Sequence, residues 1–317
     1  MTKFAFIFPG QGSQTVGMGK DVYDHYPNAQ NLFVRADECL GEAFSKLIFE
    51  GPQETLTRTY NAQPSLLITS LALLTMFREM SDLKPDFMAG HSLGEYTAYA
   101  AANSIRFEDA VKLVRNRGLY MEQAVPSGIG TMSAVLGMDV SSLEEVTRTI
   151  TNQGEPVQLA NLNSPGQLII SGTVEGVRLA GELAKEKGAK RVLSLEVSGP
   201  FHSSLMEPAA SKLEEALNQV EFSDPDYSII SNYTGKEAGK EIKASLVKQL
   251  YSPVKWQQSV EYMIDQGVTT FIEFGPGTVL TGLVKKINRK VKTYSVKDIE
   301  SCKSVVNSIK SEVEANG

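Results

Sequence analysis

The chain has 317 residues, of which 42% are hydrophobic and 21% charged, and a formal net charge of −6 at pH 7. This composition indicates a soluble globular protein, long enough for one large or two smaller domains, and the negative charge argues against a general binder of nucleic acid or anionic membranes. The two cysteines, Cys39 and Cys302, lie far apart without a C-x-x-C motif, so we expect a reducing compartment and neither a metal site nor a disulfide framework.

The first predicted element is a buried strand at residues 4–8, followed by a glycine-rich loop at residues 9–14. The loop lacks the G-K-[ST] ending of a P-loop and the third glycine of a dinucleotide fingerprint, so it is not a phosphate cradle. Its backbone N–H groups can still approach a ligand closely. The longest apolar stretch, residues 66–77, contains threonine and serine, which indicates a buried helix and not a membrane span. We therefore expect a cytoplasmic protein.

Helices are predicted over residues 28–49 and from Gln63-Pro64 to about residue 80, with proline in the first turn. A short strand at residues 86–89 then leads into Gly90-His91-Ser92-Leu93-Gly94, and an alanine-rich helix follows. The pentapeptide reads G-x-S-x-G, and a strand, a sharp turn and a helix are the context of a nucleophile elbow. The alternative is an ordinary glycine-rich turn between a strand and a helix.

The order of elements changes from residue 130, where strands and helices alternate as βαββαβ up to residue 197. This order is the split ferredoxin-like pattern. The remainder again alternates helices and strands, which favours a mainly parallel sheet covered on both faces. We therefore predict an α/β catalytic domain of hydrolase type, formed by residues 1–128 and 198–317, with an inserted ferredoxin-like subdomain at residues 129–197.

A serine nucleophile needs a base, and the chain has three histidines. His25 lies in a polar segment, and His91 adjoins Ser92 in the elbow, where neighbouring side chains diverge. His202 lies between a predicted strand and a helix and follows the serine in the chain, as the base does in hydrolases with this elbow. Elimination therefore favours His202, against the alternative of a surface histidine at a helix start.

Acyl transfer also needs two N–H donors for the oxyanion. The N–H group of Leu93, directly after the nucleophile, is one candidate. The loop that contains Gln11 follows the first strand and is the natural source of the second.

The chain resembles the malonyl-CoA:acyl carrier protein transacylases of bacterial fatty-acid synthesis. It is also similar to the acyltransferase domains of polyketide synthases. The matching segments span nearly the whole chain and lie at residues 8–14, 90–95, 115–118, 199–203, 249–256 and 273–277. The resemblance implies the fold that we predict from the element order.

The resemblance also implies a role for each site residue. Ser92 is expected to be the nucleophile and His202 the base, with Gln11 and Leu93 forming the oxyanion hole. Arg117 is expected to bind the free carboxylate of the malonyl group, because the planar fork of arginine binds a carboxylate through two hydrogen bonds. Without the resemblance, the sequence favours a salt-bridged surface arginine at Arg117.

Two further roles follow from the resemblance. Gln249 is expected to orient His202 through its backbone carbonyl, so that no third carboxylate is needed. The pair Phe201-His202 accompanies a preference for malonyl over methylmalonyl groups in related domains.

The predicted function is transfer of a malonyl group from malonyl-CoA to the phosphopantetheine thiol of acyl carrier protein, by a ping-pong mechanism with a malonyl-serine intermediate. We expect a monomer that uses no metal or bound cofactor and no nucleic-acid or membrane partner. One alternative is a serine esterase or thioesterase, for which a carboxylate-binding arginine has no use. The other is a non-catalytic scaffold that binds carrier protein, which would be expected to lack Ser92 or His202.

Overall fold

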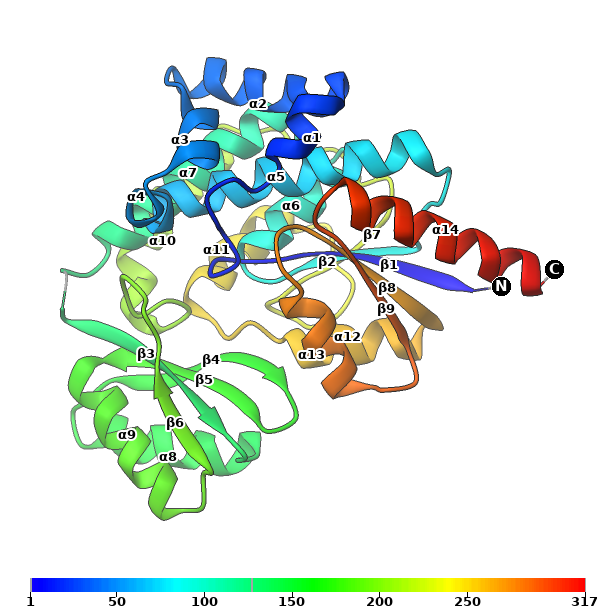
Figure 1. Cartoon of the computed structure of the whole chain (residues 1–317). Coiled ribbons are helices and arrows are strands. Elements are labelled where there is room, and N and C mark those ends of the chain that lie inside the picture. Colours follow the sequence, from blue (N-terminus) through cyan, green and yellow to red (C-terminus); the bar gives the residue numbers. More distant parts are fainter. Residues whose placement is uncertain (1, 127, 317) are drawn as a thin grey trace. The chain divides into compact units, whose positions relative to one another are not determined.

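A computed structural model describes residues 2–126 and 128–316, with side chains as far as residue 311. The chain divides into two compact units. Unit 1 comprises Met1–Arg115, Glu221–Ile230 and Met263–Gly317, and unit 2 comprises Asn116–Val220 and Ser231–Tyr262. Each unit contains one sheet, and Figure 1 labels the elements of both.

The sheet of unit 1 has five parallel strands in the order β7-β2-β1-β8-β9. The strands are β1 (Lys3–Phe8), β2 (Phe87–Gly90), β7 (Ser228–Ile230), β8 (Val268–Phe274) and β9 (Lys292–Val296). This arrangement confirms the predicted parallel sheet. Because all strands are parallel, their carboxyl ends lie at one edge, and that edge is where ligands bind in open α/β sheets.

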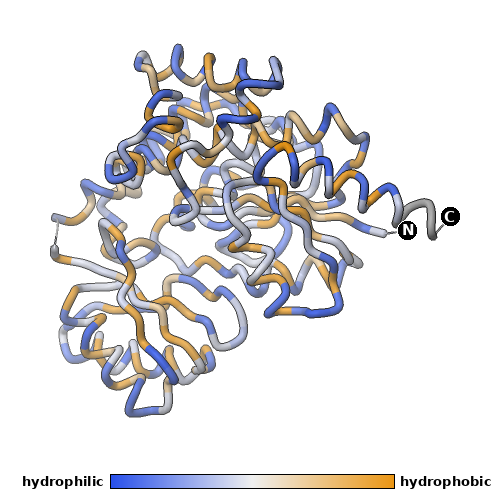
Figure 2. The backbone as a smooth tube through the Cα atoms, viewed as in Figure 1, coloured by the Kyte–Doolittle hydropathy of each residue, from blue (hydrophilic) through white to orange (hydrophobic). Residues whose placement is uncertain are grey.

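The middle strands of this sheet are continuous apolar runs because both of their faces are covered. In β1, the residues from Phe4 to Phe8 are all buried. Phe6 and Phe8 stack with Phe274 of β8, at centroid distances of 4.8 and 6.1 Å, and Phe77 packs edge-on against Phe6. The hydropathy colouring shows hydrophobic segments in these strands and mixed colours along the outer helices (Figure 2).

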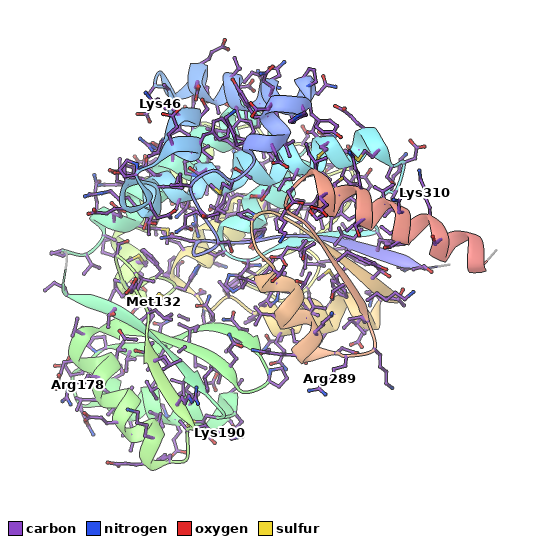
Figure 3. All side chains as sticks on the ribbon, in the orientation of Figure 1. Lys46, Met132, Arg178, Lys190, Arg289 and Lys310 are labelled. Carbon is purple, nitrogen blue, oxygen red and sulfur yellow. The ribbon has the colours of Figure 1, made fainter. Side chains whose placement is uncertain are left out.

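Helices enclose the sheet of unit 1 and carry its charged surface. They are α1 (Lys20–His25), α2 (Pro27–Leu40), α3 (Phe44–Glu50), α4 (Gln53–Thr57), α5 (Thr59–Met80), α6 (Leu93–Ala101), α13 (Val279–Ile287) and α14 (Ile299–Asn316), and α7 (Phe107–Gln123) begins in this unit. In Figure 1, α5 and α14 lie on one side of the sheet and α13 on the other. Long charged side chains such as Lys46, Arg289 and Lys310 project outward (Figure 3).

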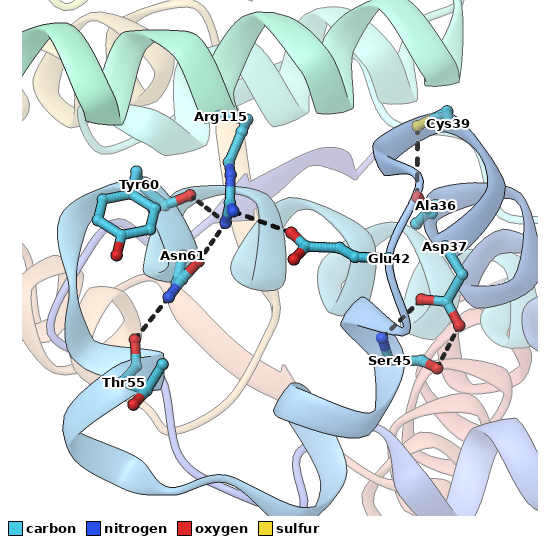
Figure 4. A network of polar contacts seen from close by, with 9 residues as sticks. All are labelled: Ala36, Asp37, Cys39, Glu42, Ser45, Thr55, Tyr60, Asn61 and Arg115. Atoms are coloured by element: carbon cyan, nitrogen blue, oxygen red, sulfur yellow. Dashed lines mark hydrogen bonds and ion pairs between the residues drawn. The ribbon is translucent and has the colours of Figure 1, made fainter.

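Helix α5 is buried along most of its length, which explains the long apolar stretch at residues 66–77. It begins at Thr59, earlier than predicted, so Pro64 lies inside the helix and not in its first turn. Proline has no N–H group to donate to the carbonyl four residues earlier, which is that of Tyr60. Arg115 Nη1 donates to this oxygen at 3.1 Å, so a side chain of α7 replaces the lost helical bond (Figure 4).

Unit 2 contains a four-stranded antiparallel sheet in the order β4-β5-β3-β6. Its elements are β3 (Gly130–Leu136), α8 (Val140–Asn152), β4 (Val157–Ser164), β5 (Gln167–Thr173), α9 (Val174–Glu186) and β6 (Arg191–Ser194). This order and pairing confirm the predicted ferredoxin-like fold. The side chains of Asp139 and Thr173 cap α8 and α9 by accepting backbone N–H bonds, which explains where both helices start.

Unit 2 is larger than the predicted insertion of residues 129–197, because the chain after β6 stays attached to it. This part forms a 3-10 turn (Ser204–Met206), α10 (Glu207–Asn218), α11 (Ile242–Tyr251) and the start of α12 (Trp256–Asp265). Two backbone bonds tie Val254 to β4, from Leu162 N to Val254 O at 2.9 Å and from Val254 N to Ala160 O at 2.8 Å. The predicted domain boundaries stay a prediction.

None of the helices among the described residues is both long enough and apolar enough to cross a membrane.

Candidate active site

The predicted elbow is present at the carboxyl edge of the parallel sheet. Strand β2 ends at Gly90 and helix α6 begins at Leu93, so Ser92 lies on the turn between them. Ser92 has φ 53° and ψ −104°, a conformation that costs an L-residue other than glycine free energy. Such strain persists only where the surrounding structure holds it, and here the flanking glycines allow a tight fit.

The two glycines of the elbow allow backbone segments to pack where a side chain would not fit. A Cβ atom on Gly90 would lie 1.9 Å from the carbonyl carbon of Gly94. A Cβ atom on Gly94 would lie 2.1 Å from the carbonyl oxygen of Phe8 in β1. The elbow therefore packs directly against the end of β1, and the His91 N–H donates to that same Phe8 oxygen at 3.1 Å.

This packing places the loop after β1 beside the elbow. Phe8 and Gly90 are register partners at the ends of the parallel strands β1 and β2, and Gln11 follows Phe8 by three residues. The Gln11 side chain donates to Thr59 Oγ1 at 3.2 Å. Leu93 is the first residue of α6, so its N–H has no acceptor within the helix, and the positive end of the helix points toward Ser92. Gln11 and Leu93 thus lie at the same edge of the sheet as Ser92, and their role as oxyanion donors stays a prediction.

The predicted base lies in unit 2 and is almost completely buried. His202 is 4% exposed and has φ 57°, so the backbone is strained here as well as at the serine. Its Nδ1 lies 2.9 Å from the backbone oxygen of Gln249 in α11, which is the contact that the resemblance implies. Because a carbonyl only accepts, Nδ1 carries the proton in the neutral imidazole, and Nε2 is the nitrogen that can accept one.

Arg117 also binds Gln249, the residue that contacts His202. Its Nη2 donates to the side-chain oxygen of Gln249 at 2.9 Å, and both residues are 1% exposed. The amide nitrogen of Gln249 in turn lies 3.5 Å from Asn232 Oδ1. Gln249 therefore binds the base through its backbone and the arginine through its side chain, so one residue positions both groups.

Two residues of this network were not singled out from the sequence. The Gln158 amide reaches the backbone oxygen of His202 at 3.4 Å and, through its oxygen, accepts from the Ser204 N–H at 2.9 Å. Asn232 is fully buried beside Gln249. Neither carries a local signal, because an isolated amide in a strand or after one is common. Phe201, the remaining predicted residue, is 6% exposed next to His202.

Other candidate nucleophiles and bases are poorly suited to catalysis. His25 is exposed, with Nδ1 2.8 Å from the Asp21 carbonyl oxygen. Burial raises the pKa of Cys302 to about 12 and also raises the pKa of Cys39, so neither thiol is poised to form a thiolate. No group of three or more histidine, cysteine, aspartate or glutamate side chains suited to a metal occurs among the described residues.

The structure thus forms the predicted site as two sets of residues, each within one unit. Unit 1 presents Ser92, Leu93 and Gln11 at one edge of its sheet, and unit 2 connects His202 to Arg117 through Gln249. The first set has the features of an acyl-accepting serine and its oxyanion donors. The second combines a buried base with a buried guanidinium. The roles of these residues stay predictions.

Comparison with known proteins identifies the family. The model of the acyl transferase domain family matches residues 5–316. The chain is 55% identical over 314 residues to the malonyl CoA-acyl carrier protein transacylase of Bacillus subtilis. The aligned region covers 98% of this chain and 99% of that protein. The transacylase structure from Clostridium perfringens superposes with a TM-score of 0.96 at 39% identity and covers 100% of both chains.

A further solved structure contains a malonyl-transacylase in complex with its type II PKS acyl-carrier protein. Its transacylase superposes with a TM-score of 0.93 at 41% identity, covering 97% of this chain and 100% of that one. The chain therefore belongs to the acyl transferase domain family and, within it, to the malonyl CoA-acyl carrier protein transacylases.

Proposed function

We propose that the protein transfers the malonyl group from malonyl-CoA to the phosphopantetheine thiol of acyl carrier protein through a malonyl ester of Ser92. The observation that carries the proposal is the link from His202 through Gln249 to Arg117. Through this link, the buried residue Gln249 contacts both the proposed proton acceptor and the proposed carboxylate-binding group. Malonyl is an acyl group with a free carboxylate, so its transfer needs both groups in one site.

In the first half-reaction, Ser92 Oγ attacks the thioester carbonyl and Nε2 of His202 takes the hydroxyl proton. The N–H groups of Gln11 and Leu93 stabilise the oxyanion. When the carbon–sulfur bond breaks, the proton passes from His202 to the departing sulfur, so coenzyme A leaves as a thiol. The second half-reaction runs the same steps backwards, with the carrier's thiol as the nucleophile.

Arg117 is proposed to bind the malonyl carboxylate throughout both half-reactions. Gln249 holds the guanidinium through Nη2, and the planar fork of an arginine can bind a carboxylate through two parallel N–H donors. Fixing this end of the substrate sets the position of the thioester carbonyl relative to Ser92. Phe201 is proposed to narrow the pocket beside the base, and this restricts substituents on the malonyl carbon.

The steps require neither a metal nor a bound cofactor, because each moves one acyl group and one proton. We also propose that the chain acts as a monomer in the cytoplasm. All of the proposed groups come from one chain, and its substrates are a soluble thioester and a carrier protein.

The test is the mass of the protein after it has been mixed with malonyl-CoA. The wild type should carry a malonyl adduct on Ser92 that disappears when carrier protein is added. Ser92→Ala should carry none, and Ser203→Ala is the matched control because that hydroxyl donates to the Pro200 carbonyl. Free malonate without a lasting adduct would instead indicate a hydrolase, and an unchanged mass a scaffold.

The assignment of the base has its own comparison. His202→Ala should slow adduct formation by roughly 10²–10⁴-fold, the usual contribution of a positioned base. His91→Ala should slow it less, because His91 acts only through the geometry of the elbow. Stopped-flow acylation measures both variants, and a slower His91 variant would reverse the assignment.

A further inference from the structure

A cavity of about 440 Å³ lies in unit 1, between α2, α5 and the segment that joins α6 to α7. Its volume is within the range of roughly 300–1,000 Å³ that is usual for small-molecule pockets. Helix α6 begins next to Ser92 and ends at Ala101, which lines the cavity. Nine helical residues span about 13 Å at 1.5 Å per residue. The cavity is therefore separate from the elbow.

Positive charge predominates in its lining, where three arginines face one carboxylate. Arg35 is held by Glu108, with Nη2 2.6 Å from Oε1, and its guanidinium carbon lies 5.0 Å from the ring centroid of Phe107. Arg78 Nη2 donates to the backbone oxygen of Ala101 at 2.9 Å. These contacts hold both guanidinium groups in place, and each group has further N–H donors.

The side chain of the third arginine, Arg106, is exposed and forms no hydrogen bond or ion pair with the described residues, although its charge acts on Glu108. The loop before it turns at Asn103, which has φ 57° and donates to Asp226 Oδ2 at 2.6 Å. The charge of Asp226 also acts on Arg78. Even with Asp226 included, the positive groups outnumber the negative ones.

The rest of the lining is mainly apolar, with Thr75 and Asn103 as the polar exceptions. Leu32 of α2 and Phe107 of α7 are half-buried and expose apolar surface, and Leu71, Leu74 and Ile105 are buried. A cavity with apolar walls and several fixed guanidinium groups matches a ligand that has both kinds of surface. A purely apolar ligand would leave the arginines without a counter-charge, and a small inorganic anion would leave the apolar surface of Leu32 and Phe107 uncovered.

We propose that this cavity binds an amphiphilic anion, a linear apolar chain that ends in a carboxylate or phosphate group. The head group pairs with Arg106 and Arg78, and the chain lies against Leu32 and Phe107. Arg35, already paired with Glu108, contributes its remaining donors. This site goes beyond the proposed acyl transfer and does not depend on it.

The experiment is calorimetric titration of the full chain with decanoate, below its micellar concentration and at low salt. We expect one-to-one binding that is about tenfold or more weaker in Arg106→Gln, since a hydrogen bond to a charged group is lost. Ala100→Phe fills the cavity and should abolish binding. The matched control is Arg148→Gln, which removes an exposed arginine of α8 and should bind as the wild type does.

Two further ligands separate the head group from the chain. Decanol should bind at least tenfold more weakly than decanoate, and acetate should not bind measurably. Decyl phosphate distinguishes the two anionic heads, because a dianion that binds more tightly than decanoate would indicate a phosphate ligand, and the reverse order a carboxylate. Either order supports the site.

Several results would overturn the proposal. Binding that Arg106→Gln leaves unchanged, or that falls equally in Arg148→Gln, would place the ligand elsewhere. Loss of binding in Arg117→Ala alone would place it in the acyl-transfer site. Equal affinity for decanol and decanoate would show an apolar groove without anion recognition. Arg106→Gln should unfold close to the wild-type temperature, because that exposed side chain forms no hydrogen bond or ion pair with the described residues.

Discussion

At the residue scale, strain coincides with the proposed chemistry. The described residues other than glycine with a positive φ are Ser92, Asn103 and His202. Asparagine adopts this conformation readily, whereas serine and histidine do so at a cost that the fold must offset. In the part of the chain that the structure describes, the proposed nucleophile and base are thus two of only three such positions.

Two arginines of one motif have different surroundings, although they are only two residues apart. Arg115 faces unit 1, where it donates to the Tyr60 carbonyl and the Asn61 side chain and pairs with Glu42 at 2.9 Å (Figure 4). Arg117 is buried in unit 2 and donates to Gln249. Composition and spacing could not separate a structural arginine from a substrate-binding one here. The resemblance assigns the substrate-binding role to Arg117, and that role stays a prediction.

Arg117→Ala should change the selectivity for the acyl group. Removing one partner of a buried charge pair costs about 2–5 kcal/mol. At about 1.4 kcal/mol per tenfold, kcat/KM for malonyl-CoA should fall by roughly 30-fold to several thousand-fold. Acetyl-CoA has no carboxylate to lose, so its use should hold steady or rise. Arg117→Lys should restore malonyl transfer only in part, because a point charge cannot replace the planar fork.

The measurement is the ratio of malonyl to acetyl transfer in folded variants. Arg115→Ala is the matched comparison, since it removes the structural arginine. It should lower the melting temperature and reduce both transfers together. If Arg117→Ala left the ratio of malonyl to acetyl transfer unchanged, as Arg115→Ala should, Arg117 would have no role in acyl recognition.

At the element scale, the close contact between the elbow and β1 can be tested by substituting Gly94, with a helical glycine that has open space around it as the control. Gly94→Ala places a Cβ atom 2.1 Å from the Phe8 carbonyl oxygen, a backbone atom that cannot move aside, so it should destabilise the fold by at least about 1–3 kcal/mol. Gly282→Ala in α13 has no heavy atom within 4 Å and should stabilise by roughly 0.5–1 kcal/mol. Urea unfolding gives both free energies, and similar values for the two variants would contradict this packing.

Glu273 links β8 to α13, and its contribution to stability should depend on pH. Glu273 is fully buried at the end of β8, and its carboxylate accepts N–H bonds from Leu280 at 3.1 Å and Thr281 at 2.8 Å. Burial raises the pKa of this carboxyl above its ordinary value, and the two backbone donors offset only part of the increase. The folded state therefore binds this proton more tightly than the unfolded state does.

The contribution of Glu273 to stability should consequently be largest below the ordinary pKa of glutamate and decrease as the pH rises through the raised value. Glu273→Gln has no proton to lose at this site. The free energy of unfolding of the wild type minus that of Glu273→Gln should therefore fall between pH 4 and pH 8. Urea titrations across this range measure the difference. A difference that rises with pH would mean that the two backbone donors outweigh burial.

At the scale of the whole molecule, periodicity and turn residues predicted the parallel sheet, the ferredoxin-like order and the elbow. These depend on local signals such as the apolar run of β1 and the glycines around Ser92. The sequence could not predict that Val254 binds β4 and so enlarges unit 2, because that contact joins segments about ninety residues apart. For the same reason the roles of Gln249 and Arg117 came from the resemblance and not from spacing.

Charge distribution gives a prediction for the whole molecule, whose net charge is −6. Exposed cations gather at the end of α13, where Lys285, Lys286, Arg289 and Lys290 follow one another closely, and Figure 3 labels Arg289 there. A second group at residues 187–191 in unit 2 is weaker, because Lys187 pairs with Glu145 at 3.0 Å. The resemblance implies that the carrier proteins on which this family acts are acidic. The cations at the end of α13 are therefore the stronger candidate for attracting a carrier protein.

Electrostatic steering raises association rates and is screened by salt, so kcat/KM for carrier protein should fall roughly tenfold between low and high ionic strength. Free pantetheine is the control acceptor, since it has the same thiol without the charge and its rate should stay flat. Reversing Arg289 and Lys290 to glutamate should remove most of the salt dependence, whereas Arg148→Glu should not. If the doubly reversed variant kept the wild-type rate and salt response, the cations of α13 would be ordinary solvated charges at a helix end.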